Sequence, residues 1–333
     1  MKKALLFLLL SLLLLAGVAW QGLQRYNAFL ETPLQVPDSG QVFQLEPGAT
    51  GVHIVEQLGQ QGLTQPGWEW RLLMRLEPMV YRAGEYQLEP GTLPRDLLVK
   101  LSGGEVVQYR ITLVEGWTFR QFAELLASNN ILKHELDLES PSQWPLLAEE
   151  FDIGNPEGWF LPETYQFTRG DSDRDILVRA HAAMNQALEA AWESRKDDLP
   201  IDSPYELLIL ASIIEKETAL DSERGQVAGV FARRLKKRMR LQTDPTVIYG
   251  LGEAYDGDIR RRDLKTDTPY NTYTRHGLPP TPIAMPGKAS LMAAARPEPG
   301  DSLYFVANGQ GGHTFSATLK AHQEAVKKLI ERQ

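Results

Sequence analysis

The sequence predicts an α+β protein with an N-terminal transmembrane helix, and three observations support this fold class. A long apolar run opens the chain, strand-turn-helix patterns fill its N-terminal half, and a capped apolar helix begins at Pro204. A composition of 43% hydrophobic and 23% charged residues is typical of a globular protein. A chain of 333 residues therefore has room for two folded domains after the first helix.

The first helix carries the features of a membrane anchor. Two lysines precede an apolar run from Ala4 to Trp20, which only Ser11 interrupts. Because positive residues stay on the cytoplasmic side, we expect a single-pass anchor over residues 1–25 with the rest of the chain outside the cytoplasm. A run of this length is at the lower limit for a span, and the small residues at 17–19 would suit cleavage, so a cleaved signal peptide remains an alternative.

Charge and cysteine content exclude several classes of protein. The chain has no cysteine, which excludes disulfides, thiolate metal sites and cysteine nucleophiles and fits an oxidising compartment. Its net charge of -8 argues against a nucleic-acid binder. A basic cluster at 233–240 follows an amphipathic pattern that begins near Ser222, and we interpret it as the solvated face of a helix.

The N-terminal half contains a weak internal repeat. FQLEPGAT begins at Phe43, YQLEPGTL at Tyr86 and ITLVEGWT at Ile111, and each combines a strand-like segment, a glycine turn and a helical pattern. The expected helices span 51–60, 94–102 and 118–128. These units predict a small α+β module over residues 38–150, which either binds an extended ligand or serves as a scaffold. Breaks at 140–142 and 154–156 separate it from a C-terminal domain over 157–333.

A carboxylate at the end of a buried helix is the first candidate for chemistry. Ser203 and Glu206 have the spacing of a capping box, and the run from Leu207 to Ile214 is apolar except for one serine. Glu215 follows that run, and an apolar environment would let it hold a proton and act as a general acid. The alternative is a structural carboxylate with a basic or backbone partner. Glu217 lies about 200° further around the helix and should face elsewhere.

Other catalytic chemistries lack their sequence patterns. The chain contains no G-x-S-x-G, S-x-x-K or H-E-x-x-H, so we expect neither a serine nucleophile nor a catalytic metal, and no cofactor. Loop residues with hydrogen-bonding or aromatic side chains suit a sugar polymer, although Asp244 and Asn271 could equally serve turns and caps. The expected substrate-binding residues are Gln242, Thr243, Asp244, Tyr249, Asn271, Tyr273 and Glu163.

Long motifs in the C-terminal half resemble one known family, the endolytic murein transglycosylases, also called YceG-like. The resemblance covers essentially the whole chain. The segments that carry it are EGWFLPETYQF at 157–167, SPYELL at 203–208, LASIIEKET at 210–218, RLQTDPTVIYG at 240–250, PYNTYTRHGLPPTPI at 269–283 and FVANGQGGHTFSATLKAH at 305–322. Met285 departs from the pattern, which has asparagine there, and this departure weakens any role of its loop in sugar contact.

The resemblance implies both a fold and an activity. The N-terminal module is expected to be LysM-like, the residues from 157 onward to be the catalytic domain, and Glu215 to be the catalytic glutamate. The implied reaction cuts the β-1,4 bond between N-acetylmuramic acid and N-acetylglucosamine without water. Glu215 would protonate the glycosidic oxygen and then take the proton of the muramyl C6 hydroxyl, which closes a 1,6-anhydro ring. The implied setting is the periplasmic face of the inner membrane, where the protein would end nascent strands beside peptidoglycan synthases, the penicillin-binding proteins.

Two other functions remain open. The chain could be a noncatalytic peptidoglycan-binding scaffold in which Glu215 is structural. It could also be a lysozyme-like hydrolase that uses water and a second carboxylate. The candidates for that second carboxylate are Asp244, Glu163 and Glu217.

Overall fold

The computed structural model describes residues 2–331 and has the mixed helix and strand content that the sequence predicts. Two compact units divide the chain. Unit 1 comprises Met1–Tyr109 with Phe167–Gly170, and unit 2 comprises Arg110–Gln166 with Asp171–Gln333.

The boundary between the units differs from the sequence-based one, because residues 110–150 belong to unit 2. Hydrogen bonds to distant parts of the chain explain this assignment. The Leu113 N–H donates to the Glu163 carbonyl at 3.0 Å, and the Gly116 N–H donates to the Met285 carbonyl at 2.9 Å.

The first helix, α1 (Lys2–Glu31), is long and apolar enough to cross a membrane. Its last turns lie in the core of unit 1, since Tyr26 is buried and the ring of Phe29 meets that of Trp70 edge-on at 5.1 Å. Arg25 also pairs with Glu69 at 2.5 Å. The helix therefore continues past the predicted end of the anchor and becomes part of a folded unit.

Unit 1 is built on an antiparallel pair of strands in which Phe43 lies opposite Tyr86. Both residues are fully buried, together with Trp70 from a helix that the sequence patterns did not indicate. The first two predicted strand-turn-helix units are confirmed. The elements that follow α1 are β1 (Gln41–Leu45), α2 (Gly51–Gln60), α3 (Trp68–Leu76), β2 (Gly84–Leu88) and α4 (Pro94–Gly103).

The third predicted unit forms a strand and a helix but joins a different sheet. Strand β3 (Tyr109–Thr112) pairs with β4 (Thr164–Phe167) rather than with β1 or β2. Helix α5 (Phe119–Ala127) follows and begins with a capping box between Thr118 and Gln121.

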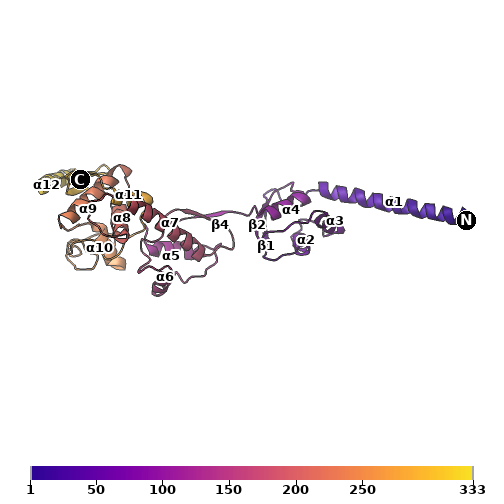
Figure 1. Ribbon diagram of the computed structural model, residues 1–333, viewed down its shortest axis with the longest axis horizontal. Helices are drawn as coiled ribbons and strands as arrows, with labels where there is room; N and C mark the ends of the chain where they lie inside the picture. Colours follow the sequence, from indigo (N-terminus) through magenta and orange to yellow (C-terminus); the bar gives the residue numbers. More distant parts are fainter. Residues whose placement is uncertain (1, 332–333) are drawn as a thin grey trace. The chain divides into compact units, whose positions relative to one another are not determined.

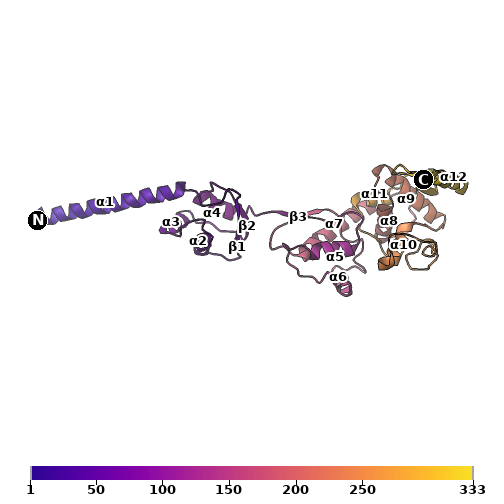
Figure 2. The same ribbon diagram turned by 180° about the vertical axis from the view of Figure 1, so that it is seen from behind.

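Helix α8 (Pro204–Glu217) lies at the centre of unit 2, where it packs against α7, α9, α10 and α11 (Figures 1 and 2). Every residue from Leu207 to Ile214 is buried, as the apolar run predicts. The other elements of unit 2 are η1 (Pro141–Gln143), α6 (Trp144–Glu150), α7 (Asp173–Glu193), α9 (Asp221–Lys236), α10 (Asp244–Leu251), η2 (Gly252–Ala254), α11 (Lys288–Ala295), β5 (Tyr304–Ala307), β6 (His313–Ser316) and α12 (Leu319–Ile330).

The predicted start of α8 is confirmed, with one difference in its cap. The Ser203 hydroxyl accepts the Glu206 N–H at 3.2 Å, but the Glu206 carboxylate accepts the N–H of Asp202 instead of that of Ser203. Inside the helix, Ser212 donates to the Ile209 carbonyl and accepts the Ile283 N–H at 3.0 Å. The single polar side chain of the apolar run therefore attaches a distant loop to α8.

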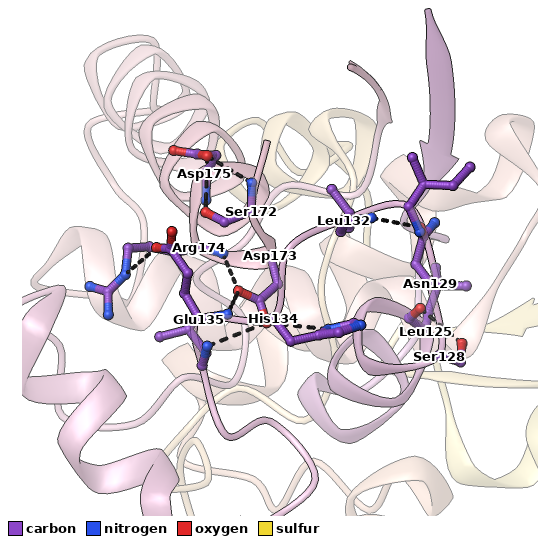
Figure 3. Close-up of polar contacts among 12 residues, drawn as sticks. Leu125, Ser128, Asn129, Leu132, His134, Glu135, Ser172, Asp173, Arg174 and Asp175 are labelled. Atoms are coloured by element: carbon purple, nitrogen blue, oxygen red, sulfur yellow. Dashed lines mark hydrogen bonds and ion pairs between the residues drawn. The ribbon is translucent and has the colours of Figure 1, made fainter. Parts of the chain in front are cut away.

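A buried carboxylate organises the start of α7 (Figure 3). Asp173 has 0% exposure, and its side chain accepts the N–H groups of Glu135, Leu136 and Arg174 at 3.0, 3.4 and 2.7 Å. The neighbouring Ser172 and Asp175 form a capping box. Asp173 thus holds the segment at 135–136 against the helix.

Glu157 is a second buried carboxyl group, with 4% exposure. It accepts the Phe119 N–H at the start of α5 and the Tyr249 hydroxyl of α10, each at 3.0 Å. Burial raises the pKa of Glu157 to about 8, although both hydrogen bonds act in the opposite direction. This carboxyl group therefore holds its proton at neutral pH while it joins three segments of unit 2.

We expect Asp173→Ala to lower the free energy of unfolding by about 2–3 kcal/mol, because it leaves buried N–H groups without an acceptor. Asp175→Ala is the matched control, since it removes a capping carboxylate next to the same helix end and should cost about 1 kcal/mol. Urea unfolding followed by circular dichroism measures both variants. Equal losses would contradict the role given to Asp173.

We expect Glu157→Gln to change how stability depends on pH. The unfolded carboxyl group ionises near pH 4.5 and the folded one near pH 8. Its contribution to stability is therefore complete below pH 4.5 and is lost as the pH rises toward 8. The neutral variant lacks this loss, so its stability relative to wild type should rise by a few kcal/mol over that range. Parallel urea-unfolding profiles from pH 5 to 8 would refute the assignment.

Candidate active site

A small polar cavity lies at the C-terminal end of α8, with a volume of about 170 Å³. Three of the residues that the sequence analysis selected for sugar binding line this cavity. Helix α8 contributes the carboxyl group of Glu217 to it. The lining residues are Glu217, Arg234, Leu241, Gln242, Asp244, Tyr273 and Phe305.

Two chain segments, one around residues 242–246 and one around residues 271–273, lie side by side at this cavity. The Gln242 N–H donates to the Thr272 carbonyl at 3.2 Å, and the Thr243 N–H donates to the Thr272 hydroxyl at 3.1 Å. Thr246 adds hydroxyl contacts to both segments. Gln242 has a φ of 50°, a left-handed conformation that is uncommon for a residue other than glycine and that occurs often at functional sites. Its exposed side chain belongs to the cavity wall.

Glu217 has the environment of a general acid. Burial raises its pKa, and the negative charge of Asp244 adds to this effect. The Thr243 hydroxyl donates to the Glu217 carboxylate, which favours the charged form and partly opposes the rise in pKa. The result is a half-buried carboxyl group that is easier to keep protonated than an ordinary glutamate and that still lines a cavity.

Arg234 forms one wall of the cavity. It is only 7% exposed, and it donates to the Leu303 carbonyl at 2.6 Å and to the Leu241 carbonyl at 2.7 Å. The interpretation of the basic cluster as a solvated helix face is therefore wrong for this residue. The signal was present in the sequence, because Arg234 follows the buried Val227 and Val230 at helical spacing.

Tyr273 and Asp244 form a hydrogen-bonded pair at the cavity. The Tyr273 hydroxyl donates to Asp244 Oδ1 at 2.5 Å, and the pKa of Tyr273 is raised by burial and by this carboxylate. Asp244 is the first residue of α10, where a negative side chain also suits the helix dipole. The cap position of α10 is Thr243, so Asp244 does not have the cap role that the sequence left open; it lines the cavity from the first turn of the helix.

Glu215 lies apart from these residues. Its Oε2 accepts the Gly287 N–H at 3.0 Å, and it raises the pKa of Glu115, whose own burial has the larger effect. The neighbouring Lys216 donates to the Gly116 carbonyl at 3.0 Å. Glu215 therefore attaches the loop around Gly287 to α8, while Glu217 faces the cavity. The proximity of Glu115 was not foreseen, although it belongs to the VEGW pattern of the third repeat.

Three other predicted binding residues have partners away from the cavity. Tyr249 donates to Glu157, and the exposed Glu163 pairs with Lys288 at 3.1 Å. Asn271 is 1% exposed; its amide donates to the carbonyls of a loop at 263–266, and its Oδ1 accepts the Tyr273 N–H at 2.8 Å. Asn271 therefore positions Tyr273, which is the turn role that the sequence left open.

Met285 belongs to the core. Its side chain is fully buried, and its N–H donates to the Trp117 carbonyl at 2.8 Å. Its Sδ accepts the Gly158 N–H at 3.2 Å. The position where the sequence departs from the family pattern thus serves internal hydrogen bonding.

Comparisons with known proteins agree on one family. The family model described as "YceG-like family" matches residues 43–328. A Bacillus subtilis protein named "Endolytic murein transglycosylase" is 34% identical over 266 residues, covering 75% of this chain and 73% of the relative. A Streptococcus pneumoniae protein of the same name is 28% identical, covering 71% of this chain but only 48% of the relative.

A solved structure gives the same result. The crystal structure of a yceG-like protein from Listeria monocytogenes matches with a TM-score of 0.56 and 29% identity, covering 86% of this chain and 99% of that one. Because the family model spans most of the sequence, the chain belongs to the YceG-like family.

Proposed function

We propose that this protein is an endolytic lytic transglycosylase that cuts the glycan strands of peptidoglycan. Its relatives from Bacillus subtilis and Streptococcus pneumoniae are named endolytic murein transglycosylases. The single observation that carries the proposal is the carboxyl group of Glu217, which has a raised pKa and lines a polar cavity in a member of this family. Such a group can protonate the oxygen that leaves when a glycosidic bond breaks.

We further propose that Glu217, rather than Glu215, is the acid and base. Protonated Glu217 gives its proton to the oxygen between N-acetylmuramic acid and N-acetylglucosamine while positive charge develops at C1 of the muramyl sugar. The resulting carboxylate then takes the proton of the C6 hydroxyl, whose oxygen attacks C1 and closes a 1,6-anhydro ring. Glu215 is a weaker candidate because it is not among the residues that line the cavity.

The other cavity residues have roles that suit an uncharged sugar. The free amide of Gln242 can bind hydroxyl or acetamido groups, and Tyr273 offers an aromatic face. Arg234, fixed by two carbonyls, places a positive charge near Glu217 and stabilises the carboxylate between the two steps. One carboxyl group is enough because the nucleophile belongs to the substrate.

A hydrolase is the second candidate, and Asp244 is the observation that favours it. This carboxylate lines the same cavity and raises the pKa of Glu217, as expected for two nearby carboxyl groups. If Asp244 activated water, the product would carry a reducing end instead of an anhydro ring. Its hydrogen bond from Tyr273 argues for a positioning role, because that bond occupies one of its two oxygens.

The N-terminal residues would place the enzyme at its substrate. We propose that α1 is a single-pass anchor in the inner membrane, with its first residues in the cytoplasm and unit 2 in the periplasm. The order β1, α2, α3, β2 with an antiparallel strand pair supports a LysM-like, glycan-binding module in unit 1, and unit 2, which begins at Arg110, is the proposed catalytic domain. In this position the enzyme would act beside peptidoglycan synthases, which are its proposed partners.

Isosteric substitutions separate the two glutamates. We expect Glu217→Gln to reduce the release of anhydro-muramyl products from purified peptidoglycan by about 10²- to 10⁴-fold, because the amide cannot donate or accept the proton. Glu215→Gln, the matched control two residues away, should retain most of the activity. Mass spectrometry of the products measures both variants of the full-length protein.

Three results would contradict this assignment. A large loss of anhydro-muramyl products in Glu215→Gln alone would show that Glu215 is the catalytic residue. Unchanged cleavage in both variants would favour a binding protein and a contaminating enzyme. Reducing ends that disappear in Asp244→Asn would establish the hydrolase.

The pH dependence of cleavage gives an independent prediction. The acid step requires protonated Glu217, so kcat/KM should fall as the pH rises above its raised pKa. The Thr243 hydroxyl lowers that pKa, and Thr243→Val should therefore move the fall to a pH higher by up to about one unit. Thr246→Val is the control, since its hydroxyl contacts Thr243 and Thr272 but not the carboxylate. A shift to lower pH in Thr243→Val would refute the role of Glu217.

A further inference from the structure

A second cavity, of about 450 Å³, lies beside the same two segments that build the candidate active site. Hydrogen bonds extend along these segments, from Arg240 to the Tyr273 carbonyl at 3.0 Å and from the His276 ring to the Arg238 carbonyl at 3.1 Å. One pair of segments therefore contributes to both cavities. The residues that line the second cavity are Leu235, Arg238, Met239, His276 and Gly277.

Arg238 gives the second cavity an exposed guanidinium group, whereas Arg234 of the first cavity is buried and donates to backbone carbonyls. Two nearby basic residues have carboxylate partners, in the pairs Lys236 with Asp198 and Arg275 with Asp267, and Arg240 donates to the Tyr273 carbonyl. Among residues 2–331, Arg238 has no ion-pair partner within 4 Å, and its side chain is exposed. Its φ of 54° is left-handed, and its N–H donates to the Leu235 carbonyl at 3.0 Å. A guanidinium group is thus available in a cavity of a chain whose net charge is negative.

The lining indicates the kind of ligand. Leu235 and Met239 offer apolar contact, while Arg238 offers two parallel N–H groups that match a carboxylate. A short peptide with small apolar side chains and a free carboxylate fits this combination better than an uncharged sugar does. In peptidoglycan, short peptides of this kind are attached to muramyl sugars.

We propose that this second cavity binds the carboxylate-bearing peptide substituent of the glycan strand whose sugar lies at Glu217. The inference rests on the proposed function, because it takes the substrate to be peptidoglycan. The two cavities share their supporting segments, so a strand bound in the first would place a substituent within reach of the second. Arg238 is then a specificity residue that distinguishes peptide-bearing strands from bare ones.

The kinetic test compares intact glycan strands with strands from the same preparation whose peptides an amidase has removed. The full-length protein in detergent micelles is assayed as wild type, Arg238→Gln and Lys237→Gln. The readout is the ratio of KM for stripped strands to KM for intact strands. We expect a ratio of about ten for wild type and for the Lys237→Gln control, and about one for Arg238→Gln. An unchanged ratio in Arg238→Gln would overturn the proposal.

A binding experiment keeps this inference separate from the proposed function. Fluorescence anisotropy measures the affinity of a labelled, N-acylated stem peptide for the same three proteins. If Arg238→Gln alone bound the peptide about tenfold more weakly, the result would support peptide binding in the second cavity, even if wild type cleaved neither strand. Absence of peptide binding to wild type, or equal binding to all three proteins, would overturn it.

Discussion

The burial of α8 on all sides is the constraint on which unit 2 depends. Every residue from Leu207 to Ile214 is covered, which requires neighbouring helices around the whole circumference of this helix. Such a helix cannot rotate or shift without exposing apolar area, at a cost of about 25 cal/mol per Å². Its last turn is therefore held in a fixed orientation, and the carboxylates of Glu215 and Glu217 emerge from the core in defined and different directions.

The two glutamates differ in their surroundings more than in their chemistry. Glu215 accepts a backbone N–H from a loop and lies near Glu115, while Glu217 accepts a hydroxyl, lies near Asp244 and lines a cavity. Burial and the charge of Asp244 raise the pKa of Glu217, and the hydrogen bond from Thr243 partly opposes this rise. The same residue type therefore contacts a loop backbone at one position and lines a cavity two residues later.

Several buried polar groups outside the cavity serve to hold distant segments together. Asp173, Glu157 and Ser212 each accept backbone N–H groups from elsewhere in the chain. The side chain of Asn271 accepts the Tyr273 N–H within a local turn and donates to the carbonyls of the loop at 263–266. A site assembled from loops needs this support, because loops have no hydrogen-bond ladder of their own to fix their positions. The stability of unit 2 and the geometry of its cavity thus depend on shared interactions.

The sequence by itself determined the local elements of this protein, because their causes are local. Apolar periodicity and the Ser203 cap predicted α8, the alternating segments and glycine turns predicted β1 and β2, and the first apolar run predicted α1. It also selected Gln242, Asp244 and Tyr273, which the structure brings together. The tertiary structure decided that Glu217 shares their cavity and that residues 110–150 belong to unit 2. These outcomes depend on contacts between residues far apart in the chain, which periodicity and spacing cannot encode.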